Sequence, residues 1–173
     1  GSLLSLPDLV EDPRVASWTV VDLVDRLGAR PARVNVVVCD AARFVAEHRG
    51  EPFDAVVCFG LLMYLKPDAS RALLAGLGRA VKPGALLLSH EPRASAAAGL
   101  DPAIERPVDA AAEAAPGGWT TVLAERHNHP AFWGAAARLG PLRAWEGLLG
   151  SALLAVEARC DGGLDALTVL RRA

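Results

Sequence analysis

The sequence predicts an α/β domain built on a mostly parallel β-sheet with helices on both faces. Two short apolar runs, Asp54–Phe59 and Ala85–Ser89, lack the polar–apolar alternation of a strand with one face in water. Between them the apolar residues recur at helical spacing and fall on one face: Leu73, Leu74, Leu77 and Val81. Two apolar strands joined by a crossover helix lie parallel, and a parallel sheet needs helices on each face. Residues 53–91 therefore predict one complete strand–helix–strand unit.

The boundaries of the helix in this unit are marked by particular residues. Asp68 suits the N-cap position, because its side chain can accept a hydrogen bond from an amide of the first turn. Lys82-Pro83-Gly84 is a strong stop signal, since proline and glycine both disfavour continuation of a helix. We therefore expect the helix to begin at Asp68 and to end before Lys82.

The segments ahead of this unit alternate between strand and helix patterns. Buried strands are predicted over Trp18–Val21, which ends at Asp22, and over Val34–Cys39, which ends at Asp40. The expected helical segments are a short helix over Leu3–Val10 limited by Pro7, a turn over Asp25–Ala29, and an amphipathic helix over Ala41–His48 with Phe44 and Val45 inward.

Beyond Pro92 the composition shifts toward alanine, proline and glycine. A segment of this length without strong periodicity is typically a functional lid or a variable insert, and we expect one over residues 94–118. A weak helix is predicted inside it over Pro107–Ala115, and a further helix over Pro130–Leu139 with proline at its first position. We treat the whole chain, 1–173, as a single domain.

The end of the chain carries a hairpin signal. Two strand-like runs, Ala152–Cys160 and Leu164–Leu170, flank Asp161-Gly162-Gly163, which is typical of a tight turn between antiparallel strands. An antiparallel hairpin is therefore expected to finish the otherwise parallel sheet.

Composition narrows the class of protein. With 173 residues, 52% hydrophobic and 22% charged, the chain is long enough for a substantial core. A net charge of −2 gives no support for nucleic-acid binding through phosphates, and no apolar run is long enough for a membrane helix. Three cysteines without paired spacing, and no signal segment, favour a reduced, cytoplasmic protein. Only Lys66 and Lys82 are lysines among 18 basic residues, an arginine excess typical of GC-rich bacterial genomes.

Polar or flexible residues follow each predicted parallel strand. These strand ends are Asp22, Asp40, Phe59-Gly60 and His90-Glu91. Open α/β sheets bind ligands outside the carboxyl ends of their strands, where the strand order reverses. A carboxylate such as that of Asp22 suits the paired hydroxyls of a ribose, because it accepts and does not donate hydrogen bonds. The alternative for either aspartate is a helix N-cap.

The central unit also carries a family resemblance. FDAVVCFGLLMYL, RAVKPG and ALLLSHEP together resemble the second half of class I S-adenosylmethionine-dependent methyltransferases, and the resemblance covers roughly Gly1 to Pro92. It implies a Rossmann-like sheet that ends in an antiparallel hairpin. The strand and glycine-rich turn that open this family's fold do not precede Leu3 in this chain. Two interpretations of Gly1 stay open: the last glycine of that turn, or a residue left from cloning.

The resemblance implies S-adenosylmethionine as cofactor and assigns residues to it. Asp22, followed by Leu23, corresponds to the acid that binds the ribose, and Asp40 with the amide of Ala41 corresponds to the pair that reads the adenine edge. Phe59 and Gly60 would line the methionine side, while Leu61 and Leu62 would lie against the adenosine, and Gly1 would belong to the glycine-rich turn. These assignments are expectations from the family.

The sequence gives several candidates for the catalytic residue and does not single out one of them. Methyl transfer is an in-line displacement that depends largely on positioning, and a base is needed only where the acceptor loses a proton. His90 and Glu91, placed after their strand, would face the acceptor, and Tyr64 is a further candidate. His127 and His129 form an H-x-H pair in an expected loop, too few ligands for a metal site.

Three functions remain to be compared. The leading one is methyl transfer from S-adenosylmethionine to a small-molecule acceptor whose identity the sequence does not reveal. The second is an incomplete or non-catalytic module whose site is completed elsewhere, suggested by the missing glycine-rich turn. The third is an NAD-dependent oxidoreductase, which requires a G-x-G-x-x-G before the second strand of the fold; the sequence contains none.

Overall fold

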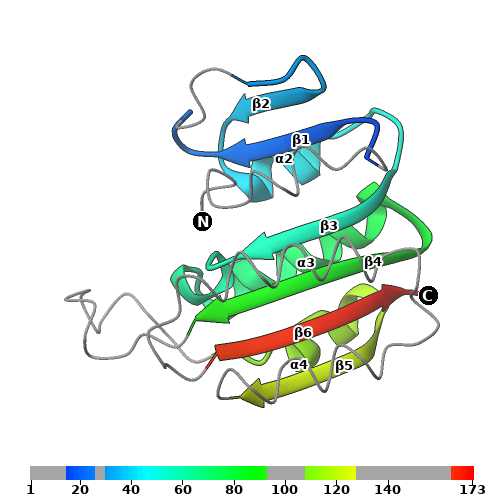
Figure 1. The fold of residues 1–173 in the computed structure, drawn as a ribbon. Helices are drawn as coiled ribbons and strands as arrows, with labels where there is room; N and C mark the ends of the chain where they lie inside the picture. Colours follow the sequence, from blue (N-terminus) through cyan, green and yellow to red (C-terminus); the bar gives the residue numbers. More distant parts are fainter. Residues whose placement is uncertain (1–14, 26–29, 93–107, 128–164) are drawn as a thin grey trace.

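The computed structural model describes residues 15–25, 30–92, 108–127 and 165–173, and Figure 1 shows them as coloured ribbon. The elements, in chain order, are β1 (Trp18–Asp22), β2 (Val34–Val38), α2 (Ala41–Glu47), β3 (Phe53–Phe59), the 3-10 helix η2 (Leu62–Tyr64), α3 (Pro67–Ala80), β4 (Val81–Pro92), α4 (Ala110–Ala114), the 3-10 helix η4 (Ala115–Gly117), β5 (Trp119–His127) and β6 (Asp165–Arg172). The α/β class predicted from the sequence is confirmed.

The strands form two sheets. β1 and β2 pair in parallel, and the second sheet has the order β3-β4-β6-β5, in which β3 and β4 are parallel. β6 runs antiparallel to both of its neighbours, so the predicted antiparallel strand at the C-terminal end of the sheet is confirmed. Its predicted partner, Ala152–Cys160, lies outside the described residues; within them, β4 and β5 pair with the two edges of β6.

In the described part of the chain, no strand pairing joins the two sheets. Among the described residues β1 pairs only with β2 and β3 only with β4, and Figure 1 shows β1 and β3 running in the same direction. All five residues of β1 are only half-buried, whereas Ala85–Ser89 in β4 are buried. The sequence pattern predicts a strand buried on both faces, but among the described residues β1 has one neighbouring strand, and its apolar side chains are only half-buried.

The core lies between the sheets and the three described helices, which cover one face (Figure 1). α3 supplies its centre through Leu73 and Leu74, because the helical period brings both onto the face against the sheet. The indole N–H of Trp119 donates to the carbonyl of Leu74 at 2.8 Å, which joins α3 to β5. α2 packs closely on α3: a methyl group added at Gly76 would come within 3.2 Å of the Val45 side chain. The inward orientation predicted for Val45 is confirmed.

The ends of α3 and β4 differ from the prediction. α3 begins at Pro67 with Lys66 as N-cap, not Asp68, because proline at the first position needs no amide partner and has the helical φ angle already. Asp68 instead forms an ion pair with Arg71 within the first turn. β4 extends past both ends of the predicted Ala85–Ser89, since pairing with β3 and β6 on its two sides holds the extra residues extended.

The expected insert over 94–118 is in part a piece of the core. Val108, Ala110 and Ala114 are buried, and α4 packs against α3. The short helix predicted within this segment is confirmed as α4. The rest of the insert, the predicted turn beyond Asp25, and the helices predicted over Leu3–Val10 and Pro130–Leu139 lie outside the described residues. Within the described part of the chain, no helix has both the length and the apolar character needed to cross a bilayer.

Candidate functional site

The strand order defines where a ligand would bind. The chain passes from β1 outward to β2, then returns to the other side of β1 to form β3 and β4, so the order reverses between β1 and β3. The arrowheads of β1, β2, β3 and β4 all point to one edge in Figure 1. In open α/β sheets this edge, at the reversal, is where ligands bind. The candidate site is therefore the carboxyl edge formed by the ends of these four strands.

Asp22 and Asp40 lie at neighbouring strand tips on this edge. Asp22 is the last residue of β1 and is aligned with Val38, while the Cys39 amide donates to the Asp22 carbonyl at 3.0 Å. Two residues further along, Asp40 caps α2, and its Oδ1 accepts from the Arg43 amide at 2.9 Å. The parallel register thus places the two aspartates at the ends of adjacent strands.

Both carboxylates already accept one backbone hydrogen bond. Oδ1 of Asp22 accepts from the Val24 amide at 3.3 Å, and Oδ1 of Asp40 makes the cap described above. No hydrogen bond to Oδ2 of either aspartate comes from the described residues. A carboxylate has about four acceptor positions, so each side chain can hold its turn and still accept a donor from a ligand. The N-cap alternative is correct for Asp40, but the cap uses Oδ1 and leaves Oδ2 for a ligand.

Apolar side chains flank the two acids. Leu23 is 69% exposed and Val38 is 56% exposed, and Val24 is also exposed. These side chains offer apolar surface at the carboxyl edge next to the two carboxylates. Ala41, whose amide was predicted to contact a ligand, is the first residue of α2, where backbone N–H groups have no partner within the helix.

The turn after β3 forms the other side of the edge. Gly60 has φ +54°, a left-handed conformation that glycine adopts without a steric penalty, and it redirects the chain into η2. Leu61 is half-buried against the core, and Tyr64 is 46% exposed on the turn. Leu62 is fully buried in the core, so its expected contact with a ligand is wrong. Phe59 is aligned with His90 across the β3–β4 pair.

Glu91 occupies a different position from the one predicted. It lies inside β4, not after it, and is only 4% exposed. Its Oε1 accepts from the Leu62 amide and its Oε2 from the Met63 amide, each at 3.2 Å. The hydroxyl of Ser89 also donates to Oε1, at 3.4 Å. The carboxylate is thus directed into the turn after β3. Sequence reasoning missed this because the contact joins residues 28 and 29 positions apart.

Cys58 lies close to this buried charge. Burial raises the pKa of the Cys58 thiol, and the negative charge of Glu91 raises it further, to about 12. The thiol therefore stays protonated at neutral pH and acts as a small apolar side chain of β3.

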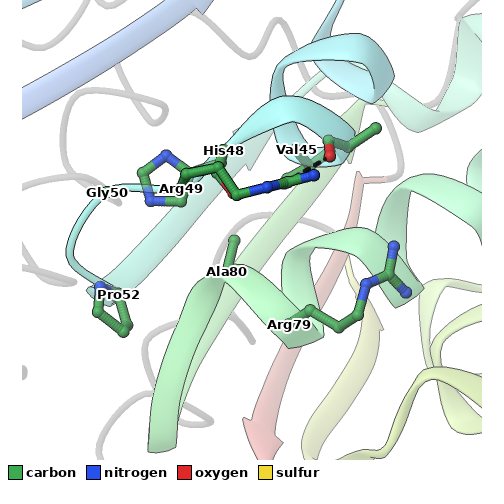
Figure 2. A pocket seen from close by; sticks show the side chains of 8 residues that line it. Val45, His48, Arg49, Gly50, Pro52, Arg79 and Ala80 are labelled. Atoms are coloured by element: carbon green, nitrogen blue, oxygen red, sulfur yellow. Dashed lines mark hydrogen bonds between the residues drawn. The ribbon is translucent and has the colours of Figure 1, made fainter.

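A cavity of about 270 Å³ lies at the opposite edge of the sheet (Figure 2). Its walls come from the end of α2, the segment leading into β3 and the end of α3, and include His48, Arg49 and Arg79. Arg49 donates to the carbonyls of Ala46 and His48, and Arg79 donates to that of Ala75. Arg49 thus satisfies carbonyls at the C-terminus of α2, where cations are favoured. The cavity is at the amino ends of β3 and β4 and does not belong to the candidate site.

Some predicted residues are placed only in part. Gly1 and His129 lie outside the described residues. His127 is the last residue of β5, paired with Asp165, so its expected position in a loop is wrong. β5 and β3 are the two outer strands of the four-stranded sheet, so His127 lies at the opposite side of that sheet from β3.

We compared the chain with protein families, curated sequences and solved structures, and only the solved structures gave matches. No family model and no curated protein sequence matches this chain. Among solved structures, N-methyltransferase NodS from Bradyrhizobium japonicum is similar with a TM-score of 0.57 and 15% identity over 90% of this chain and 73% of that chain. The Burkholderia thailandensis 1,6-didemethyltoxoflavin-N1-methyltransferase gives 0.54 and 19% identity, over 90% of this chain and 60% of that one.

A third structure extends the comparison. The cyclopropane synthase MmaA2 from Mycobacterium tuberculosis has a TM-score of 0.53 and 13% identity, over 98% of this chain and 82% of that chain. The chain therefore spans from 60% to 82% of the length of these three proteins. Identities this low establish the fold and leave activity open. The sheet order, the antiparallel β6 and these likenesses together show that the chain has the same α/β fold as these two methyltransferases and the cyclopropane synthase.

Proposed function

We propose that this domain binds S-adenosylmethionine and transfers its methyl group to a small-molecule acceptor. The observation that carries the proposal is the pair Asp22 and Asp40, placed by the parallel register at adjacent strand tips beside the reversal of strand order. NodS has been crystallised with S-adenosylhomocysteine, and so has the Burkholderia enzyme, which also holds its substrate 1,6-didemethyltoxoflavin. These likenesses support the cofactor class, and the acceptor stays open.

The groups at the carboxyl edge have the chemistry that adenosine requires. In this proposal Oδ2 of Asp22 accepts from the ribose hydroxyls, and Oδ2 of Asp40 accepts from the exocyclic amine of the adenine. The Ala41 amide, at the first position of α2, is free to donate to a ring nitrogen. The exposed Leu23 and Val38 supply an apolar surface for the base. The donor and acceptor set therefore fits the nucleoside half of the cofactor.

The methionine half would meet the turn after β3. Gly60 has no side chain, so the backbone of the turn can approach a ligand closely, and Phe59 and Leu61 flank it. When bound, S-adenosylmethionine supplies a methyl group on a sulfonium that is transferred by in-line displacement. The residues of this chain then hold the cofactor and direct the acceptor along that line. His90 and Tyr64 stay our candidates for removing a proton where the acceptor carries one.

A second candidate function is an incomplete module. It is favoured by the edges of β1 and β3 that have no pairing partner in the described part of the chain. Unprotected apolar edges are a liability that proteins normally cover. The buried indole N–H of Trp18, on β1, also finds no hydrogen-bond partner in the described part of the chain. In this alternative, cofactor binding requires a strand from outside the described residues. An NAD-dependent oxidoreductase is less favoured, because β6 is antiparallel.

Calorimetric titration with S-adenosylhomocysteine tests these proposals. We expect saturable binding to the wild-type chain and weaker binding to Asp22→Asn, which removes the charge and one acceptor. The matched control is Asp54→Asn, because Asp54 is an exposed aspartate whose ion pair with Lys82 lies at the other end of β3. Equal affinity of Asp22→Asn and Asp54→Asn contradicts the ribose assignment. Absence of saturable heat with a folded wild-type chain favours the incomplete module.

A further inference from the structure

A buried carboxylate joins the end of β4 to the turn that follows β3. Both oxygens of Glu91 are occupied, Oε1 by the amide of Leu62 and Oε2 by that of Met63, and the side chain is 4% exposed. A charge that is removed from water is costly unless it is hydrogen-bonded, and here backbone donors from another strand connection satisfy it. Glu91 is therefore an anchor for this turn.

The backbone amides of Leu62 and Met63 need a hydrogen-bond acceptor from outside their own helix. They belong to the first residues of η2, and the first amides of a helix have no intrahelical partner. A carboxylate is a strong acceptor for such donors, because hydrogen bonds to ionised groups are shorter and stronger than neutral ones. The turn is otherwise held by Leu62 in the core and by short-range bonds such as the Tyr64 amide to the Leu61 carbonyl at 3.2 Å.

The direction of the carboxylate argues against proton transfer. A general base must come within hydrogen-bond reach of the proton that it removes. The oxygens of Glu91 are buried and directed toward Leu62 and Met63, not toward the exposed surface of the edge. The same turn carries Gly60 and the exposed Tyr64. An effect of Glu91 on ligands would therefore pass through the conformation of the turn.

We propose that Glu91 is a positioning residue that holds the Gly60–Tyr64 turn in the conformation in which it meets the cofactor. This inference rests on the proposed function, because it takes S-adenosylmethionine as the ligand of this edge. An affinity that depends on one conformer falls in proportion to the population of that conformer. If the turn without its anchor adopts the binding conformation about one tenth of the time, the cofactor dissociation constant rises about tenfold.

The test combines a local and a functional measurement on Glu91→Gln. The amide keeps the size of the side chain but offers a single acceptor oxygen and places N–H donors near the Leu62 or Met63 amide. We expect faster hydrogen exchange at these two amides by NMR and a dissociation constant for S-adenosylhomocysteine about tenfold higher by calorimetry. The matched control is Glu113→Gln, a buried glutamate on α4, which should lower thermal stability and leave the dissociation constant within about twofold.

A second variant keeps the proposal testable if Glu91→Gln does not fold. Glu91→Asp keeps the charge but is one methylene shorter, so it reaches fewer of the turn amides and should give an intermediate rise in the dissociation constant. Loosened Leu62 and Met63 amides together with wild-type affinity in either variant overturn the positioning role and leave the proposed function standing. A folded wild-type chain that binds no S-adenosylhomocysteine refutes the proposed function, and the positioning role with it.

Discussion

Substitutions of Asp40 can separate its role as the N-cap of α2 from its proposed role as a ligand acceptor. The cap needs only one acceptor oxygen, whereas the ligand contact uses the second oxygen of the carboxylate. The cap uses Oδ1, which accepts from the Arg43 amide at 2.9 Å. Serine caps a helix about as well as aspartate does, so Asp40→Ser should leave the free energy of unfolding nearly unchanged. Asp40→Ala removes the acceptor and should lower that free energy by about 1 kcal/mol.

The expected loss of affinity follows from the charge of the second oxygen. Hydrogen bonds to charged groups contribute about 1.5–3 kcal/mol, so loss of the carboxylate that reads the adenine amine should raise the dissociation constant roughly 10- to 150-fold. Asp40→Ser and Asp40→Ala should lose affinity to a similar extent, although only the second is destabilised.

Urea denaturation and calorimetric titration with S-adenosylhomocysteine measure the two effects on the same samples. Glu47→Gln is a suitable control, since its partner Arg43 lies on the exposed face of α2 and the pair contributes little. If Asp40→Ser binds as tightly as wild type, Asp40 is a helix cap only, and the assignment of the adenine edge to this strand tip is wrong.

The remaining predictions concern titration and packing. The pKa of the Cys58 thiol is raised from 9.0 to about 12 in the folded chain, so this thiol ionises first in the unfolded chain as pH rises. The free energy of unfolding should therefore fall between about pH 9 and 12. Urea denaturation at several pH values should show a less steep fall for Cys58→Val. Thermal unfolding should show that Gly78→Ala destabilises the folded chain more than Gly84→Ala does. The new methyl group at Gly78 would lie 2.7 Å from the carbonyl oxygen of Gly117. At Gly84 it meets nothing within 4 Å, and only the φ of +77° costs about 1–2 kcal/mol. Leu74→Ala, at a fully buried position, should cost about 2–5 kcal/mol of unfolding free energy, and a loss below about 1 kcal/mol would contradict its central place in the core.

The pattern of apolar residues was sufficient to predict the elements of the first half of the chain. Trp18–Asp22 and Phe53–Phe59 are strands because their runs are too short and too β-branched for helices. The helical period of Leu73 and Leu74 predicted α3, and both lie in the core. The ends of the strands could also be predicted, because aspartate and glycine are typical of the turns that follow strands.

Other features depend on which segments become neighbours. The partner of β6 could not be derived from a local hairpin signal, because pairing with β4 and β5 satisfies both of its edges over its whole length. The length of β4 likewise depends on neighbours on both sides. The start of α3 was misplaced because the preference of proline for the first position outweighs the capping preference of Asp68.

By itself, the sequence determined the α/β class, the order of the elements and the presence of acids at the ends of two parallel strands, because these follow from local periodicity and residue type. Only the tertiary structure decided that Asp22 and Asp40 lie together, that Leu62 faces the core, and that Glu91 binds amides of a turn 28 and 29 residues away. Such contacts depend on strand register and on the burial of one specific charge, and neither is encoded in the spacing of residues along the chain.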